Sequence, residues 1–262
     1  MYNPTVRPLI FSWGPFHVAG YGLMIVIGGV VVFGLLYPRM EKLGLKNDEQ
    51  FWLFVNITLL SGPVSGRILY LFEYTKPFSA DFWHSMFALS TDFSMLGAFI
   101  GMPLAFWAFA RWYKIPFMRF FDGVCLMACV WHIFGRLGCF MAGCCHGRPT
   151  ALPWGIVFTD PRCSVPARWL GTPLHPTQLI EAAGDAVLAA FLWRAFKREA
   201  GSGLVAAMWF GCYGALRFMT EFLRGDTVPL SFGLTAGQLF SLGLMAAAGV
   251  ILIWRHENLR TA

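Results

Sequence analysis

The clearest indication of the fold of this chain is the stretch FHVAGYGLMIVIGGVVVFGLLY at residues 16–37. They contain no Lys, Arg, Asp or Glu, and the uncharged run around them extends from residue 8 to residue 38. About 20 predominantly apolar residues suffice for an α-helix to cross the hydrocarbon core of a bilayer. The stretch therefore predicts a membrane-spanning helix.

The composition extends this prediction to the whole chain. Of 262 residues, 57% are hydrophobic and 13% are charged, whereas a typical soluble domain has about 25% charged residues. A soluble fold could not keep this much apolar surface away from water. The 28 glycines and 11 tryptophans are typical of membrane helices and their interfacial belts. We therefore predict an all-α polytopic membrane protein that forms a single domain over residues 1–262.

The apolar segments and the positive charges together predict a topology. We expect seven spans, at residues 16–37, 51–73, 93–110, 121–140, 178–196, 203–222 and 236–254. Lys and Arg accumulate on the cytoplasmic side of a membrane protein. One set of loops and ends carries eleven of them: Arg39, Lys42, Lys46, Arg111, Lys114, Arg119, Arg194, Lys197, Arg198, Arg255 and Arg260. The other set carries six: Arg7, Lys76, Arg148, Arg162, Arg168 and Arg224. The N-terminus and the long loop at about 141–177 should therefore lie outside, and the C-terminus in the cytoplasm.

The net charge of +6 is explained by the excess of Lys and Arg in the cytoplasmic loops, where anionic lipid lies nearby. A nucleic-acid-binding protein would need a soluble basic face, and the loops offer none. We expect the lipid bilayer as a partner, no nucleic acid and no cofactor.

Charged side chains at membrane depth are costly unless they are paired or face water, so they indicate function. In the second span, Gly62 and Gly66 have the spacing that lets another helix approach closely. Arg67 and Tyr70 follow them. Arg67 is equally well explained as a side chain that reaches out to the interface.

The sixth span carries Tyr213, Arg217 and Glu221 on one face, because they lie four residues apart. Arg217 and Glu221 can pair directly. The alternative is an internal salt bridge without function, although Arg224 and Asp226 extend the polar strip beyond one pair.

The fifth span begins with HPTQLIEAAGD, residues 175–185. Gln178, Glu181 and Asp185 share one face, and His175 precedes a proline suited to the first helical turn. The alternative is a polar seam between packed helices.

Arg136, between Gly135 and Gly138, ends the fourth span. With Arg67, Arg217 and Arg224 it makes four guanidinium groups expected near one face of the membrane. Guanidinium groups suit phosphate, and the abundant phosphate at that depth is the phospholipid headgroup. The residues alone thus predict a protein that binds a phospholipid head between its helices.

Seven cysteines offer a competing site. They are Cys125, Cys129, Cys139, Cys144, Cys145, Cys163 and Cys212. We interpret Cys125, Cys129 and Cys212 as small apolar fillers within spans. The others could form disulfides in an oxidising compartment. The C-x4-C-C-H spacing is not the paired C-x2-C pattern of zinc sites, so we expect no metal. A catalytic thiol activated by Arg136 or Arg148 ranks below a structural role.

In combination, these motifs resemble the prolipoprotein diacylglyceryl transferase family over nearly the whole chain. The motifs are YGLM at 21–24, GRILY at 66–70, GRLGCF at 135–140 with Gly143, HPTQ at 175–178 with Glu181, Tyr213 with Arg217, Glu221 and RGD at 224–226, and GQ at 237–238. Their order, spacing and depth carry the resemblance, since each motif alone is weak.

The resemblance implies transfer of the diacylglyceryl group of phosphatidylglycerol to the thiol of a lipobox cysteine in a preprolipoprotein. The product is a thioether, and glycerol 1-phosphate leaves. It also implies a bacterial inner-membrane enzyme with its site toward the outer leaflet, and we expect a monomer. The catalytic residues by resemblance are Arg136, Arg217, Tyr213, Glu221 and His175. The residues implied in substrate binding are Tyr21, Arg67, Gly135, Gly138, Gln178 and Arg224.

Three features depart from the family pattern. Leu96 stands where many members have a histidine treated as the base, Cys139 and Ala142 stand where many have Asn, and Ile180 replaces a tyrosine. The thiolate could then form through the arginine field, or through His175 or His146. The alternatives are a paralogue that serves another acceptor, a non-catalytic lipid-binding membrane protein, or a redox protein centred on the outer cysteines.

Overall fold

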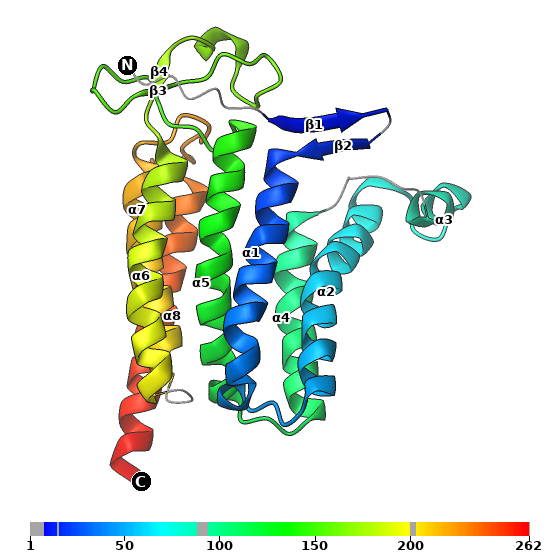
Figure 1. Cartoon of the computed structure of the whole chain (residues 1–262), viewed down its shortest axis with the longest axis vertical. Helices are drawn as coiled ribbons and strands as arrows, with labels where there is room; N and C mark the ends of the chain where they lie inside the picture. Colours follow the sequence, from blue (N-terminus) through cyan, green and yellow to red (C-terminus); the bar gives the residue numbers. More distant parts are fainter. Residues whose placement is uncertain (1–7, 15, 88–93, 200–202, 262) are drawn as a thin grey trace. The chain divides into compact units, whose positions relative to one another are not determined.

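The computed structural model describes residues 8–14, 16–87, 94–199 and 203–261. The described chain is mostly helical, as a polytopic membrane protein requires (Figure 1). It comprises two compact units, one of Met1–Pro38 with Phe121–Ala262 and one of Arg39–Phe120. The prediction of a single domain remains a prediction.

Most helices belong to the larger unit. They are α1 (Gly20–Leu36), α5 (Phe117–Ala142), α6 (Thr177–Glu199), α7 (Leu204–Glu221) and α8 (Ala236–Thr261). The smaller unit contains α2 (Asp48–Tyr74), α3 (Ala80–Phe87) and α4 (Met95–Trp112). Two short 3-10 helices, η1 (Tyr37–Leu43) and η2 (Ala167–Trp169), complete the helical segments.

A helix lies at each of the seven predicted spans, and within the described residues length and apolarity support four of them as spans. Those four are Gly20–Leu43, Asp48–Tyr74, Phe117–Ala142 and Ala236–Glu257. Polar residues such as Glu181 in α6 and Arg217 in α7 reduce the apolarity of those two helices. The seven-span count and the orientation therefore remain predictions.

Two short antiparallel sheets correct the all-α prediction. β1 (Leu9–Trp13) pairs with β2 (Phe16–Ala19) around Gly14, whose φ of 57° suits a residue without a side chain. β2 runs directly into α1, so the first four residues of the predicted span 16–37 are strand. β3 (Ile156–Val157) pairs with β4 (Pro173–Leu174) in the long loop. An apolar run permits either a strand or a helix, and pairing with β1 makes Phe16–Ala19 a strand.

Small residues bring α2 and α4 together in the smaller unit. A Cβ added to Gly97 would lie 2.6 Å from the carbonyl oxygen of Ser65 and 2.9 Å from the Cα of Gly66. The Ser94 N–H donates to the Gly66 carbonyl at 2.9 Å. The close helix approach expected at Gly62 and Gly66 is thus confirmed at Gly66.

In the larger unit, a buried carboxylate supports the start of α7. The Asp122 side chain accepts hydrogen bonds from the N–H groups of Gly203 and Ala206, both at 3.0 Å. These donors have no partner within their own helix, and the helix dipole favours a negative charge there. α5 and α7 are thereby joined at one end.

The long loop has a small core of its own. Phe158, Cys163, Val165 and Leu174 are buried together. The loop is attached to the end of α7, because the Arg148 N–H donates to the Leu223 carbonyl at 2.8 Å. The loop therefore lies over the ends of α5, α6 and α7 in a defined position.

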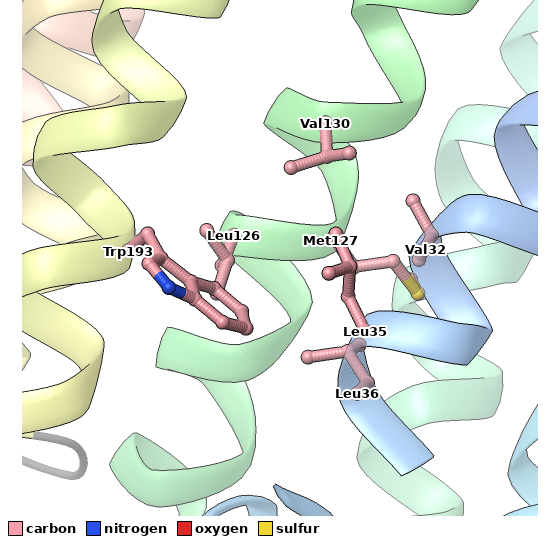
Figure 2. A pocket seen from close by; sticks show the side chains of 7 residues that line it. All are labelled: Val32, Leu35, Leu36, Leu126, Met127, Val130 and Trp193. Carbon is pink, nitrogen blue, oxygen red and sulfur yellow. The ribbon is translucent and has the colours of Figure 1, made fainter. Parts of the chain in front are cut away.

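An apolar pocket lies among α1, α5 and α6 (Figure 2). Its lining residues are Val32, Leu35, Leu36, Leu126, Met127, Val130 and Trp193. None of these side chains is charged, so the pocket does not suit a phosphate.

Candidate active site

Glu181 of α6 is the centre of the polar cluster in the larger unit. Its Oε2 lies 2.7 Å from Nη2 of Arg136 on α5, and its Oε1 lies 3.1 Å from Nη1 of Arg217 on α7. The Glu181 side chain is 1% exposed. One buried carboxylate thus holds guanidinium groups from two other helices.

Glu221 continues the cluster along α7. Its Oε2 lies 2.7 Å from Nη2 of Arg217, one helical turn away, and the Thr235 hydroxyl donates to its Oε1 at 2.8 Å. The predicted Arg217–Glu221 pairing is confirmed. It is not an isolated salt bridge, because Glu181 from another helix contacts the same guanidinium.

A glycine on α8 makes room for this carboxylate. A Cβ added to Gly237 would lie 2.8 Å from the Glu221 carboxylate carbon and both oxygens. Only a residue without a side chain fits there while Glu221 keeps its position.

Arg224 lies just beyond α7 and is 6% exposed. Asp226 accepts two hydrogen bonds from it, from Nε at 2.9 Å and from Nη2 at 2.6 Å. Its Nε also lies 3.8 Å from the Glu221 carboxylate. The arginines at 136, 217 and 224 are therefore linked through shared carboxylates.

His132 is a member of the cluster that sequence reasoning missed. Its Nδ1 lies 2.6 Å from Oδ2 of Asp185, and Arg136 Nε donates to its Nε2 at 3.1 Å. Because the guanidinium is always the donor, Nδ1 carries the proton and donates to Asp185. The available signal was its position four residues before Arg136, on the same helical face.

Two tyrosines border the cluster. Tyr213 stacks on Trp209 with ring centroids 5.7 Å apart and meets the His132 ring edge-on at 5.0 Å. Tyr21 on α1 is 44% exposed and packs against Gly138 of α5. The structure thus places Tyr213 on the ring that accepts from Arg136, and Tyr21 beside a glycine two residues after Arg136.

The two glycines beside Arg136 differ in environment. A Cβ on Gly138 would lie 3.0 Å from the Tyr21 ring and 3.2 Å from the Tyr21 backbone, so this glycine permits the approach of α1 to α5. A Cβ on Gly135 would meet only Ile25, at 4.0 Å. Of these two glycines, Gly138 is the one that lies tightly against α1.

Two other predicted site residues contact the loop. Gln178 donates from Nε2 to the Cys144 carbonyl at 2.7 Å and so supports the loop. His175 pairs through its backbone with Gly147 and Arg148. The catalytic role of His175 remains a prediction.

Arg67 belongs to the smaller unit and donates to the Ser85 carbonyl there. Its guanidinium also lies 5.4 Å from the centre of the Tyr70 ring. Leu96 lies in the first turn of α4, and its side chain is outside the described part of the structure.

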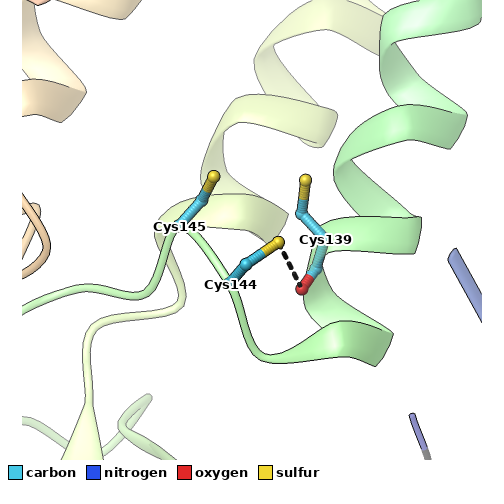
Figure 3. Close-up of side chains that lie close together, drawn as sticks. All are labelled: Cys139, Cys144 and Cys145. Carbon is cyan, nitrogen blue, oxygen red and sulfur yellow. Dashed lines mark hydrogen bonds between the residues drawn. The ribbon is translucent and has the colours of Figure 1, made fainter. Parts of the chain in front are cut away.

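Three thiols converge at the end of α5 and in the turn that follows it (Figure 3). The sulfur atoms of Cys139, Cys144 and Cys145 all lie within 4.8 Å of one another. Hydrogen bonds from the other two thiols, followed by the charges of Arg224 and Arg136, lower the pKa of Cys145. This position therefore favours a thiolate.

All seven cysteines are free thiols in the structure. Cys125 and Cys129 are buried fillers, as expected, but Cys212 is exposed on α7 and fills no core. Burial raises the pKa of Cys163, which lies in the core of the loop.

The arginines of the cluster retain unused hydrogen-bond donors. Each carboxylate contact occupies one or two of the five donors of a guanidinium, so each arginine can still donate to a further oxyanion. The carboxylates keep the guanidinium groups in place at a depth where unpaired charges would be costly. The arrangement suits a reaction in which negative charge develops on a phosphate.

Comparison with known proteins identifies the family of this chain. A model of the prolipoprotein diacylglyceryl transferase family matches residues 8–254. The phosphatidylglycerol–prolipoprotein diacylglyceryl transferase of Clostridium tetani is 32% identical over 238 residues, which cover 90% of this chain and 93% of the relative. The enzyme of the same name from Solidesulfovibrio magneticus is 33% identical over 251 residues, with 92% and 91% covered. That of Cupriavidus metallidurans is 28% identical, with 98% and 96% covered. The chain therefore belongs to the prolipoprotein diacylglyceryl transferase family.

Proposed function

We propose that this chain is a phosphatidylglycerol–prolipoprotein diacylglyceryl transferase in which Arg136 and Arg217 hold the lipid phosphate. The observation that carries the proposal is the Glu181 bridge, which fixes two guanidinium groups from different helices side by side. Family membership supports the same transferase chemistry.

In this reaction, negative charge develops on the phosphate as it leaves. The acceptor thiolate forms a bond to the terminal glycerol carbon of the diacylglyceryl group, and the bond from that carbon to the phosphate oxygen breaks. The electron pair leaves with glycerol 1-phosphate. Donors aimed at the oxygen where charge grows lower the barrier, and this is the role of Arg136 and Arg217.

His132 and Asp185 act as positioning residues in this scheme. The Asp185 carboxylate orients the His132 ring, and the ring accepts from Nε of Arg136. The guanidinium is thereby held on one edge by His132 and on another by Glu181, which leaves its remaining donors for substrate. Tyr213 and Tyr21 would orient lipid or thiol beside it.

The expected topology fits this assignment. Seven spans with the N-terminus outside would place the cysteine-rich loop and the ends of α5 and α6 toward the outer leaflet of a bacterial inner membrane. Both the phospholipid headgroup and the lipobox segment could reach the site there. We expect the chain to act as a monomer, with apolar helices admitting the two acyl chains from the side.

The direct test is incubation of the purified protein with labelled phosphatidylglycerol and a lipobox peptide, followed by mass spectrometry. We expect a diacylglyceryl thioether on the peptide cysteine, lost in Arg136→Ala and in Arg217→Ala. Arg162→Ala is the matched control, because Arg162 pairs only with Asp160 on the exposed loop among the described contacts. A wild-type protein that forms no adduct would refute the assignment. Full activity in either cluster variant would refute the phosphate role.

A further inference from the structure

We propose that Cys139, Cys144 and Cys145 form a binding site for one thiophilic metal ion of the Zn²⁺ class. Among the described residues, these three form the one group of His, Cys, Asp or Glu side chains whose ligand atoms converge closely enough to share an ion. The spacing in the sequence concealed the site because it differs from C-x2-C.

The backbone turn after α5 brings the sulfurs together. α5 ends at Ala142, Gly143 has a φ of 74° and Cys145 a φ of 58°. A Cβ on Gly143 would lie 2.9 Å from Cβ of Cys163, so the turn also packs tightly on the loop core. The chain thus reverses and carries Cys144 and Cys145 back beside Cys139 (Figure 3).

The separation of the sulfurs suits a metal. Zn–S bonds of about 2.3 Å in tetrahedral geometry place thiolate sulfurs about 3.8 Å apart. The three sulfurs here lie within 4.8 Å of one another, which is close to that spacing.

Buried polar groups of α6 hold the backbone of this turn. The Thr177 hydroxyl donates to the Cys145 carbonyl at 2.6 Å, and Gln178 donates to the Cys144 carbonyl at 2.7 Å. Thr177 is 0% and Gln178 1% exposed. Supports of this kind orient the ligands of metal sites, and here they fix two of the three ligands before any ion arrives.

The local charge also suits the site. Three thiolates and one dication carry a net charge of −1. Gly147, two residues after Cys145, pairs with Arg224, and Arg136 precedes Cys139 by three residues on α5. Positive charge is therefore close to the three sulfur atoms.

The fourth coordination position gives the site a role that rests on the proposed function. Tetrahedral zinc with three protein ligands keeps one position for water or substrate. A thiol that binds there loses its proton to water. Its sulfur then forms the bond to the glycerol carbon while the bond to the phosphate oxygen breaks. The metal changes neither charge nor oxidation state.

Metal content tests the site independently of activity. The full chain, purified in detergent under reducing conditions, should bind one Zn²⁺, and Co²⁺ in its place should give a thiolate-to-cobalt charge-transfer band. Each of Cys139→Ser, Cys144→Ser and Cys145→Ser should abolish stoichiometric binding. Cys212→Ser, a change at an exposed cysteine of α7, should leave it intact. Gln178→Ala should weaken binding by about 10- to 100-fold.

Failure of the metal site and failure of the proposed transferase function give different experimental results. Absence of one-to-one binding, a Co²⁺ spectrum without the charge-transfer band, or a disulfide among the three cysteines would each overturn the metal site. Binding of a lipobox peptide should alter the Co²⁺ spectrum, and its Cys→Ser analogue should not. An unaltered spectrum, in a protein that does form the thioether, would overturn the acceptor role. A loaded protein that forms no thioether would instead refute the proposed function.

Discussion

Oε2 of Glu181 lies 2.7 Å from Nη2 of Arg136, and the two side chains are only 1% and 10% exposed. The ion pair joins α6 to α5 through residues 45 positions apart in the chain. Removing one partner of a buried ion pair leaves the other charge uncompensated, which is costly.

Glu181→Ala should therefore lower both stability and activity. We expect a loss of about 3–5 kcal/mol in the free energy of unfolding, because Arg136 and Arg217 would both lose a carboxylate. Thermal unfolding in detergent measures the effect. Asp160→Asn, at an exposed ion pair, is the control. Equal stability of the two variants would contradict the bridging role.

His132→Phe should lower the turnover number more than it raises KM for phosphatidylglycerol. The phenyl ring fills the space but accepts no hydrogen bond from Arg136, and a misplaced catalytic group can cost about 100-fold in rate. His132→Gln should restore part of the loss, since its amide oxygen can accept from Nε. Steady-state kinetics measure the turnover number and the KM of each variant separately. Equal rates for the Phe and Gln variants would remove the positioning role of His132.

Gly237→Ala should disturb the site through Glu221. The new Cβ would lie 2.8 Å from the carboxylate, and such overpacking typically costs about 1–3 kcal/mol in stability. Gly243→Ala on the same helix meets nothing within 4 Å and should be neutral or stabilising, because alanine is the better helix former. Unfolding and transfer assays on the two variants give the comparison. A neutral Gly237→Ala would show that Glu221 is free to move.

Cys145 should remain reactive at lower pH than an ordinary thiol. Its pKa is lowered by the neighbouring thiols and then by Arg224 and Arg136, so its thiolate persists as pH falls. The pKa of Cys163 is raised by burial, so its thiolate should disappear as pH falls below the alkaline range. Alkylation of the metal-free protein by iodoacetamide between roughly pH 6 and pH 9, followed by peptide mass spectrometry, gives the two profiles. Identical profiles would contradict the expected order.

Local regularities were accessible from the amino-acid sequence. Residue spacing predicted the Arg217–Glu221 pair because residues four apart meet on one helix face, and the structure confirms it. The hairpin before α1 was not predicted, because an apolar run permits either a strand or a helix. Residues 16–19 are drawn into β2 by pairing with β1.

Contacts between helices were not accessible in the same way. Periodicity placed Glu181 and Asp185 on one face of α6, but it could not tell which partners they would meet. The partners are Arg136 and Arg217 for Glu181 and His132 for Asp185. The grouping of Arg67 with the other arginines remains a prediction, because Arg67 belongs to the smaller unit, where it donates to the Ser85 carbonyl and lies over the Tyr70 ring.

A membrane protein of apolar helices that carry arginines can be recognised from the amino-acid sequence, because composition and periodicity act locally along the chain. The pairing of each carboxylate with its arginine, and the meeting of Cys139 with Cys144 and Cys145 across a turn, are visible in the folded chain alone. A buried charge or thiol takes its properties from its neighbours in space. Those neighbours come from helices whose mutual register no single segment encodes.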